Sequence, residues 1–439
     1  MSLDEASHEP TVVSENLLSN LTNRLPEQTN TRPEIELLLC CARIEMDASS
    51  LARVRELLRG ELDWPYLTKV ALRNGVMPLV YRQLNCNFAD VVPETQLRRW
   101  RDLFRHNTAR NLLRAGELCR ILELLAKHGI DAIPYKGAAL AVDAYGDLSL
   151  RQFSDIDVLI RRCDLRRATE ALSAEGYQPE FELSETQQRV FLRWWYVQPF
   201  SRGDGIYHLE IHWTIAPHFF SFPFETERLW KRTRTLRVAD MEMSVPAKED
   251  LLLMLCVHGA KDSWARLEWI CAIAELIRAG GAKEALDWEA LMREVEATGS
   301  VRMILLGLSL ARELLGVELP CEILKRIDGS RALRALSDRV VRNLFRETKR
   351  ASSFSGKSLF HLRVREKLSD KIRYCARVAV ATSPHEWRLF ALPPSLYFIY
   401  SLVRPFRLLT SFVADRAKRG LATKVAGSSE LDPSKQASE

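Results

Sequence analysis

The spacing of apolar residues changes along this 439-residue chain. From Pro33 to about residue 105, and again from about residue 236 onwards, apolar residues recur at three- and four-residue intervals, as in EIELLLCCARIEM and KEDLLLMLCVHGAK. This period predicts helices with one buried face. Between these regions, IDAIPY, DIDVLI and HLEIHW are short runs with β-branched residues or with alternating apolar and polar residues, which predicts strands. The pattern therefore predicts a mostly helical α+β protein, in which N- and C-terminal helical regions flank a small mixed β-sheet.

Strands and helices alternate in the middle of the chain. The helix ARNLLRAGELCRILELLAKHG is predicted to end at Gly129, and the strand IDAIPY leads to Lys136 and Gly137. A short helix, AALAVDAYG, precedes the strand DIDVLI. The next helix is expected to use Asp164 as its N-cap and to end at Gly176. The segments RWWYVQPFS, RGDG and IYHLEIHWTI then predict a hairpin.

Two aspartates interrupt the apolar strand RQFSDIDVLI, residues 151–160. Because alternate residues of a strand share a face, Asp155 and Asp157 point the same way, about 6.6 Å apart. Such a pair repels itself unless a cation lies nearby. Glu210 has a similar place in HLEIHW, between Leu209 and Ile211. Three carboxylates on adjacent strands can bind two Mg²⁺ (or Mn²⁺) ions and leave positions open for phosphates.

Three residues near this acidic group are candidates for phosphate binding. Lys136 ends a strand and is suited to phosphate as a point charge, although a structural ion pair with an aspartate is the alternative. Gly137 would let the backbone approach a triphosphate, next to the amides that open the following helix. Arg151 could bind phosphate oxygens through both arms of its guanidinium, or be an ordinary surface arginine.

Three further residues could approach the same site. His212 shares a strand face with Glu210 and would be a proton acceptor, a phosphate contact or a structural histidine. His258 and Lys261 are three residues apart in LCVHGAKDSW, so they share a helix face. They would touch a nucleotide if that helix packs across the cleft.

These motifs carry a resemblance to a known group of proteins. KGAALAVDAYGDLSLRQFSDIDVLI followed by LEIHW resembles the polymerase-beta-type nucleotidyltransferase superfamily, and more closely a bacterial family of uncharacterised nucleotidyltransferases. The resemblance implies that Asp155, Asp157 and Glu210 are the catalytic, metal-binding carboxylates. It also implies that Lys136 and Gly137 form the turn between strand and helix.

The resemblance extends over most of residues 33–410 through DWPYLTKVALRNGVMPLVYRQL, HGAKDSWARLEWICAIAEL and LPPSLYFIYSLVRPFRLL. The chain departs from the superfamily pattern in two places. Ala138 stands where a Gly or Ser usually follows the first glycine, which removes a hydroxyl that could contact phosphate. The gap between Gly137 and Asp155 is also longer than usual.

Two functions fit these features. The first is a Mg²⁺-dependent nucleotidyltransferase that moves NMP from an NTP, ATP among them, to an unidentified hydroxyl-type acceptor and releases pyrophosphate. The acceptor would be a small molecule, a saccharide or a protein. The second is a catalytically degenerate binding or scaffold protein that uses a basic C-terminal region at a membrane surface or a nucleic acid.

Composition adds an expected location. A hydrophobic share of 47% supports more than one core, and the nine cysteines are scattered without a CxxC pair, which fits a reducing cytosol. MSLDEASHEP has no apolar core of a signal peptide. Residues 389–403 form an apolar stretch that is shorter than the roughly 20 residues of a membrane span. We expect a cytoplasmic protein without a transmembrane segment, with peripheral membrane attachment as the alternative.

The net charge of +6 is distributed unevenly. Residues 331–424 contain 21 Lys and Arg but only 6 Asp and Glu. Such a region could meet anionic lipid, nucleic acid or polyphosphate, or form a solvated surface. The predicted organisation is a disordered N-terminus (1–32), a helical region (33–105), the nucleotidyltransferase core (106–235), a helical domain covering the cleft (236–330), the basic region (331–424) and a disordered tail (425–439).

Overall fold

The chain forms two compact units. Unit 1 comprises residues 1–182, 196–217 and 222–347, and unit 2 comprises residues 183–195, 218–221 and 348–439. Within them, the computed structural model describes residues 32–203, 205–280, 285–346, 354–382, 387, 392–393, 396–397 and 399–410.

Some predictions cannot be compared with the structure. Apart from Arg32, the tails predicted at 1–32 and 425–439 lie outside the described residues, as do residues 389–391, 394–395 and 398 of the apolar stretch 389–403. The predicted domain boundaries remain predictions.

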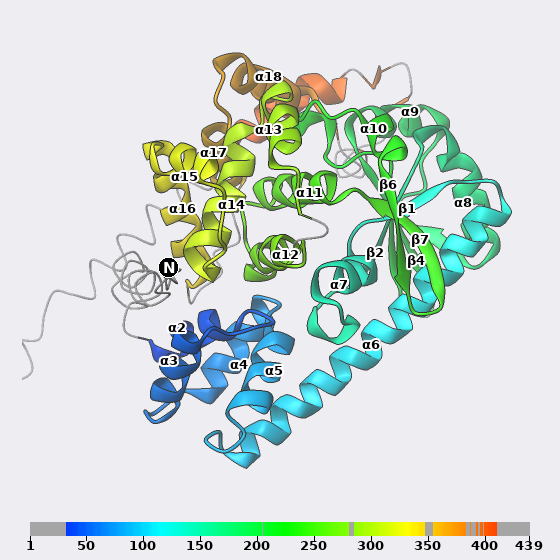
Figure 1. Ribbon diagram of the computed structural model, residues 1–439. Helices are drawn as coiled ribbons and strands as arrows, with labels where there is room; N and C mark the ends of the chain where they lie inside the picture. The colour runs from blue at the N-terminus through cyan, green and yellow to red at the C-terminus, as the bar shows by residue number, and fades with distance from the viewer. Residues whose placement is uncertain are drawn as a thin grey trace, which may run out of the picture. The chain divides into compact units, whose positions relative to one another are not determined.

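Unit 1 contains two groups of helices. The first comprises α2 (Pro33–Cys41), α3 (Ala48–Leu58), α4 (Trp64–Arg73), α5 (Met77–Asn87) and the long α6 (Glu94–Lys127). The second comprises α11 (Lys248–Lys261), α12 (Leu267–Arg278), α13 (Trp288–Ala297), α14 (Val301–Leu315), α15 (Cys321–Asp328) and α16 (Arg331–Leu344). Helix α6 contacts α5 towards its start and the sheet towards its end (Figure 1).

A five-stranded mixed sheet lies within unit 1. Its order is β1 (Ala132–Pro134), β2 (Asp155–Ile160), β5 (His208–His212), β4 (Val197–Arg202) and β3 (Tyr177–Pro179). Strands β2 and β5 are parallel, whereas the other neighbouring pairs are antiparallel. The predicted fold class, a mostly helical chain around a small mixed sheet, is confirmed. The predicted hairpin is also confirmed as β4 and β5, although its first residues belong to helix α9.

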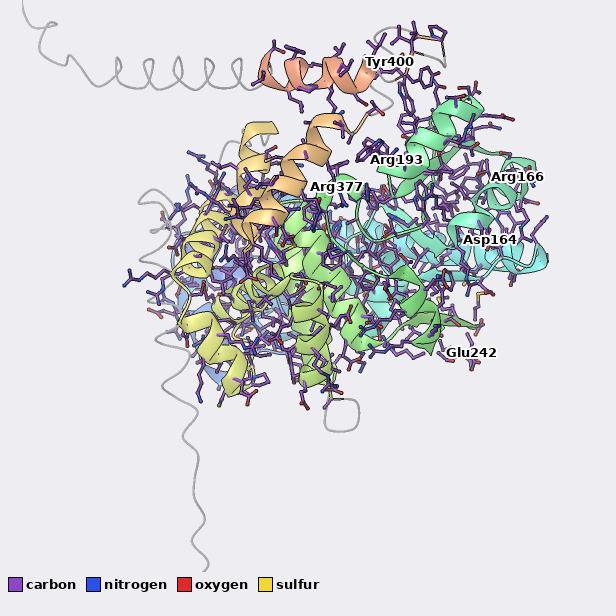
Figure 2. The ribbon with its side chains drawn as sticks, turned by 90° about the horizontal axis from the view of Figure 1, so that it is seen from above. Asp164, Arg166, Arg193, Glu242, Arg377 and Tyr400 are labelled. Atoms are coloured by element: carbon purple, nitrogen blue, oxygen red, sulfur yellow. The ribbon has the colours of Figure 1, made fainter. Side chains whose placement is uncertain are left out.

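Helix α8 (Leu165–Ala174) follows β2, as expected. Gly176 has a φ of +83°, which agrees with its predicted role after the helix. The prediction for Asp164 is wrong in one respect. Asp164 occupies the N-cap position, but its carboxylate accepts a hydrogen bond from the side chain of Arg167 instead of a backbone N–H. Figure 2 labels Asp164 and, within α8, Arg166.

A second hairpin was not expected. Strands β6 (Thr233–Val238) and β7 (Met241–Pro246) pair antiparallel, and β7 contacts β1. The expectation of helices from about residue 236 is therefore wrong up to Ala247, where α11 is about to begin. Ala239 in the turn has a φ of +52°. Tight hairpin turns normally place Gly, Asn or Asp at such positions, so the usual sequence signal is missing there.

Unit 2 contains α9 (Glu185–Trp194), the 3-10 turn His218–Phe220, α17 (Phe354–Val364), α18 (Leu368–Val380) and a helix over 399–410. Nδ1 of His361 in α17 lies 2.9 Å from the hydroxyl of Tyr374 in α18. Arg377, labelled in Figure 2, donates to the carbonyl of His218. Across the described parts of both units, no helix has the length and apolar character needed to cross a membrane.

Candidate active site

The sheet brings the three predicted carboxylates to one face. In β2, Ile156 and Val158 are buried in the core and alternate with Asp155 and Asp157. The parallel register pairs Asp157 with Glu210 of β5. Because side chains alternate across a strand, all three carboxylates project from the same side of the sheet.

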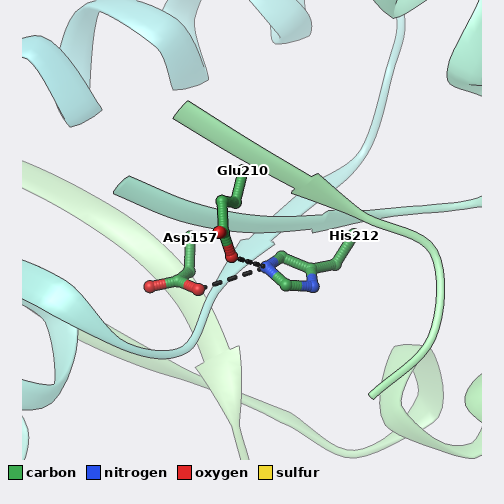
Figure 3. Close-up of side chains that lie close together, drawn as sticks. All are labelled: Asp157, Glu210 and His212. Atoms are coloured by element: carbon green, nitrogen blue, oxygen red, sulfur yellow. Dashed lines mark hydrogen bonds and ion pairs between the residues drawn. The ribbon is translucent and has the colours of Figure 1, made fainter. Parts of the chain in front are cut away.

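His212 lies against two of these carboxylates (Figure 3). Its Nε2 is 3.1 Å from Asp157 Oδ1 and 3.2 Å from Glu210 Oε2, and the side chain is fully buried. An ionised carboxylate only accepts hydrogen bonds, so Nε2 must carry a proton. Nδ1 is buried and has no hydrogen-bond partner among the residues that the structure describes. His212 thus serves as a donor that holds the two carboxylates in place.

Lys136 lies on the other side of Asp157, with Nζ 3.1 Å from Oδ1. Burial alone would raise the pKa of Asp157, but Lys136 and His212 hold that pKa well below its usual value. Burial likewise opposes ionisation of Glu210, yet the hydrogen bond and charge of His212 leave its pKa lowered. Both carboxylates are therefore anionic at neutral pH.

Asp155 differs from its two neighbours. Burial is the main cause that raises its pKa. The hydrogen bond with Ser154 opposes this, whereas the negative charges of Asp157 and Glu210 add to it. No cation of the described residues lies within 4.0 Å of its carboxylate as an ion-pair partner. The acidic group thus has more negative charge than Lys136 and His212 balance.

Gly137 forms the turn between β1 and α7 (Gly137–Tyr145). Its φ is +53°, and a Cβ at this position would lie 3.1 Å from the carbonyl oxygen of Asp155. Both the conformation and the close approach favour glycine. The turn therefore lies directly beside the start of β2.

The acidic face opens into a cavity of about 550 Å³ in unit 1. The predicted site residues that line it are Lys136, Arg151, Asp155, Asp157, Glu210, His258 and Lys261. Gly137 lies beside it, and its carbonyl accepts a hydrogen bond of 3.4 Å from Arg151. His212 lies behind the carboxylates instead of lining the cavity.

Helices α11 and α12 form one wall of the cavity. Lys261 Nζ donates to the hydroxyl of Tyr196 at 2.6 Å and lies 3.1 Å from Asp262 Oδ2. His258 packs edge-on against Trp269, with ring centroids 5.0 Å apart. Burial, together with the positive charges of Lys136 and Lys261, lowers the pKa of His258 well below its usual value. His258 is therefore neutral at physiological pH.

Helix α6 forms another wall, which sequence reasoning missed. His106, Asn107, Arg110 and Arg114 face the cavity from it. Arg114 donates through Nε to the carbonyl of Ser154 at 2.9 Å. The sequence did contain a signal for Arg114. This arginine falls within the stripe of apolar positions that the helix buries. A buried arginine within an amphipathic stripe is unusual unless it has a partner.

The acidic group has the chemistry of a divalent-cation site. One donor atom each from Asp157, Glu210 and His212 lies within 4.8 Å of the others. Because Nε2 of His212 carries a proton, it cannot bind a metal ion through that atom. The remaining ligands are the carboxylate oxygens of Asp157 and Glu210, and Asp155 lies on the same face of the sheet. Oxygen ligands are those that Mg²⁺ prefers. Three carboxylates on this face with only Lys136 and His212 as close basic partners among the described residues also agree with a cation site.

Comparison with known proteins places the chain in a family. Residues 60–316 match the model of the family described as uncharacterised nucleotidyltransferase. The chain belongs to this family. The match covers more than half of the nucleotidyltransferase chain and includes every predicted site residue. The predicted resemblance is thus confirmed, and with it the expectation of a transferase enzyme.

Among solved structures, the chain is similar to the solution structure of the antibiotic-resistance factor ANT(2'')-Ia, a protein described as having substrate-regulated conformation dynamics. The sequence identity between ANT(2'')-Ia and the chain described here is 15%. The match covers 43% of this chain and 93% of ANT(2'')-Ia, with a TM-score of 0.29. No curated protein matches the chain.

Proposed function

We propose that the protein transfers NMP from an NTP to a hydroxyl-type acceptor, in a reaction that depends on Mg²⁺ or Mn²⁺ and releases pyrophosphate. One observation carries the proposal: Asp155, Asp157 and Glu210 share one sheet face and line one cavity with Lys136, Arg151 and Lys261. Carboxylates suited to a metal and cations suited to phosphates are what this reaction requires.

The chain's own residues have distinct parts in this proposal. Asp155, Asp157 and Glu210 would hold the divalent cation, which when bound promotes attack by a hydroxyl and neutralises the departing pyrophosphate. His212 and Lys136 position Asp157 through the contacts described above. The turn at Gly137 and the cations Arg151 and Lys261 surround the phosphate chain. His258, being neutral, would contribute a hydrogen bond or a ring contact to the nucleotide.

The test is nucleotide transfer by the full chain. Wild type and Asp157→Asn are incubated with labelled ATP, GTP, CTP and UTP plus Mg²⁺ or Mn²⁺, and released pyrophosphate and labelled products are measured. Asp131→Asn is a matched control, because Asp131 is an exposed aspartate that pairs with Arg161. We expect activity in wild type and the control, and a loss of about 100- to 1,000-fold in Asp157→Asn. Equal signals from wild type and Asp157→Asn would remove the case for catalysis at this site.

We also propose that unit 2 attaches peripherally to anionic membranes. Of the twelve clearly exposed large apolar side chains in the described residues, nine lie between 359 and 409. On α18, Leu368, Ile372, Cys375 and Ala376 form an exposed apolar stripe at helical spacing, opposite the buried Tyr374. Basic residues border the stripe, including Arg363 and Lys371 at a shallow groove. Apolar side chains with basic neighbours fit the surface of an anionic bilayer.

Vesicle sedimentation tests this attachment. Wild type should sediment with phosphatidylcholine/phosphatidylglycerol vesicles but not with phosphatidylcholine alone, and 0.5 M salt should weaken binding. The double substitution Leu368→Asp with Ile372→Asp should abolish it. Leu112→Asp with Leu113→Asp is the control, since both leucines are 56% exposed on α6. Equal loss in both double variants, or no sedimentation of wild type, would contradict the proposal.

A further inference from the structure

The cations around the cavity differ in whether they have a carboxylate partner. Three are paired, each with a nitrogen 3.1 Å from a carboxylate oxygen: Lys136 with Asp157, Lys261 with Asp262, and Arg266 with Glu268. These pairs account for much of the acidic charge in the lining. They bring the lysines and Arg266 close to charge balance without a ligand.

The other three cations are Arg110, Arg114 and Arg151. Among the described residues, no carboxylate lies within 4.0 Å of any of their guanidinium groups. Arg114 and Arg151 are nevertheless buried, at 6% and 7% exposure. Arg151 makes one weak hydrogen bond to the carbonyl of Gly137, and its buried Nε has no partner in the described structure. Burying a charge without a counter-charge is unfavourable, so these arginines have unused capacity for an anion.

The three arginines face the same space. Arg110 and Arg114 are one turn apart on α6, so they share a face. Burial, and then the nearby positive charge of Arg110, lowers the pKa of Arg114, with Asp155 opposing this. Arg151 belongs to the loop whose carbonyls accept hydrogen bonds from Asn107 and Asn111 of α6. The helix thus keeps like charges close together at the Asp155 end of the acidic group.

We propose that Arg110, Arg114 and Arg151 form an oxyanion subsite that binds a phosphate group. The geometry supports it in two ways: the three cations line the same cavity, and the two buried ones have no carboxylate partner within 4.0 Å in the described structure. The identity of the phosphate rests on the proposed function. It is either the terminal phosphates of the NTP or a phosphate on the acceptor, and both present the same chemistry to the arginines.

Direct binding tests the subsite without turnover. Titration calorimetry with inorganic phosphate and with pyrophosphate is performed on the full chain in metal-free buffer. Arg110→Gln and Arg114→Gln should each weaken binding about tenfold or more, because each removes a charge-assisted contact. Arg105→Gln is the matched control, since Arg105 is an exposed residue of α6 that does not line the cavity. Circular dichroism checks that every variant is folded.

Two further titrations identify the source of the phosphate. If the subsite binds the terminal phosphates of the nucleotide, Arg114→Gln weakens binding of ATP but not of AMP. If it binds the acceptor, both nucleotides bind unchanged, whereas inorganic phosphate no longer binds to the ATP-saturated variant. Either result supports the subsite.

The subsite is overturned if wild type and Arg114→Gln bind phosphate and pyrophosphate equally, or if Arg105→Gln loses as much affinity as Arg110→Gln. The outcome is separable from catalysis. Arginine-dependent anion binding without nucleotide transfer would remove only the proposed function. Transfer without arginine-dependent binding would remove only the subsite.

Discussion

The basic residues on the α11 side and on the α6 side of the cavity differ in whether they have a carboxylate partner. On the α11 side, Lys261 has a carboxylate partner, as Lys136 does at the sheet. On the α6 side, Arg110 and Arg114 have none within 4.0 Å in the described structure. A paired charge contributes to the native structure by itself, whereas an unpaired buried charge contributes when a ligand binds. We therefore expect substitutions on the two sides to affect stability unequally, although both should affect function.

The largest effect on stability is expected at Lys136. Lys136→Met leaves the buried carboxylate of Asp157 with only His212, and removing one member of a buried ion pair costs about 3 kcal/mol. Urea unfolding followed by circular dichroism measures the change in the free energy of unfolding. Lys127→Met, at the exposed end of α6, is the control and should stay within about 0.5 kcal/mol of wild type. If Lys136→Met lowered the free energy of unfolding by no more than the Lys127→Met control does, the ion pair of Lys136 would not stabilise the fold.

A smaller effect is expected at Gly137, between the two sides. Gly137→Ala combines a φ of +53° with a Cβ 3.1 Å from the carbonyl of Asp155 and should destabilise by about 2 kcal/mol. Gly116→Ala provides the contrast, because a Cβ there meets nothing within 4 Å. It should stabilise helix α6 by about 0.5–1 kcal/mol. Thermal unfolding would argue against a special backbone at residue 137 if the two variants shifted in the same direction.

The smallest change in stability is expected on the α6 side. Arg114→Gln removes an uncompensated charge and one hydrogen bond to Ser154, so the two effects should cancel to within about 1 kcal/mol. Adding pyrophosphate should distinguish wild type from Arg114→Gln by how much it raises the free energy of unfolding of each. At a hundredfold excess over the dissociation constant it should stabilise wild type by about 2.7 kcal/mol, and Arg114→Gln by much less at the same concentration. A large loss in ligand-free Arg114→Gln would place Arg114 among the structural charges instead.

The acidic centre could be predicted because it depends on local alternation. Apolar residues on both sides of Asp157 and Glu210 determine which way each carboxylate points, and the hairpin signal pairs β5 with β4. The contacts of His212 could not be predicted from alternation within one strand. Its period-two position puts it on the face of Glu210, but only the pairing of β2 with β5 shows that one ring nitrogen faces both carboxylates.

Other features could not be predicted from local patterns. The β6–β7 hairpin has Ala239 at a positive φ, so its turn lacks the residue type that normally indicates one. Arg110 and Arg114 precede Asp155 by more than forty positions, and no motif relates them to it. Their proximity depends on how α6 packs against the loop before β2, a tertiary contact that helical periodicity does not specify.

The hydrogen bonds from Asn107 and Asn111 to the carbonyl of Arg151 have a consequence for how this protein can vary. Successive residues of an α-helix are rotated by about 100°, so inserting or deleting a single residue between Asn107 and Arg114 would rotate part of this group away from the loop. Exchange of individual side chains is compatible with the loop's position, whereas a change in the length of α6 near this segment is not. Relatives that keep the loop should therefore differ here by replacement and seldom by insertion.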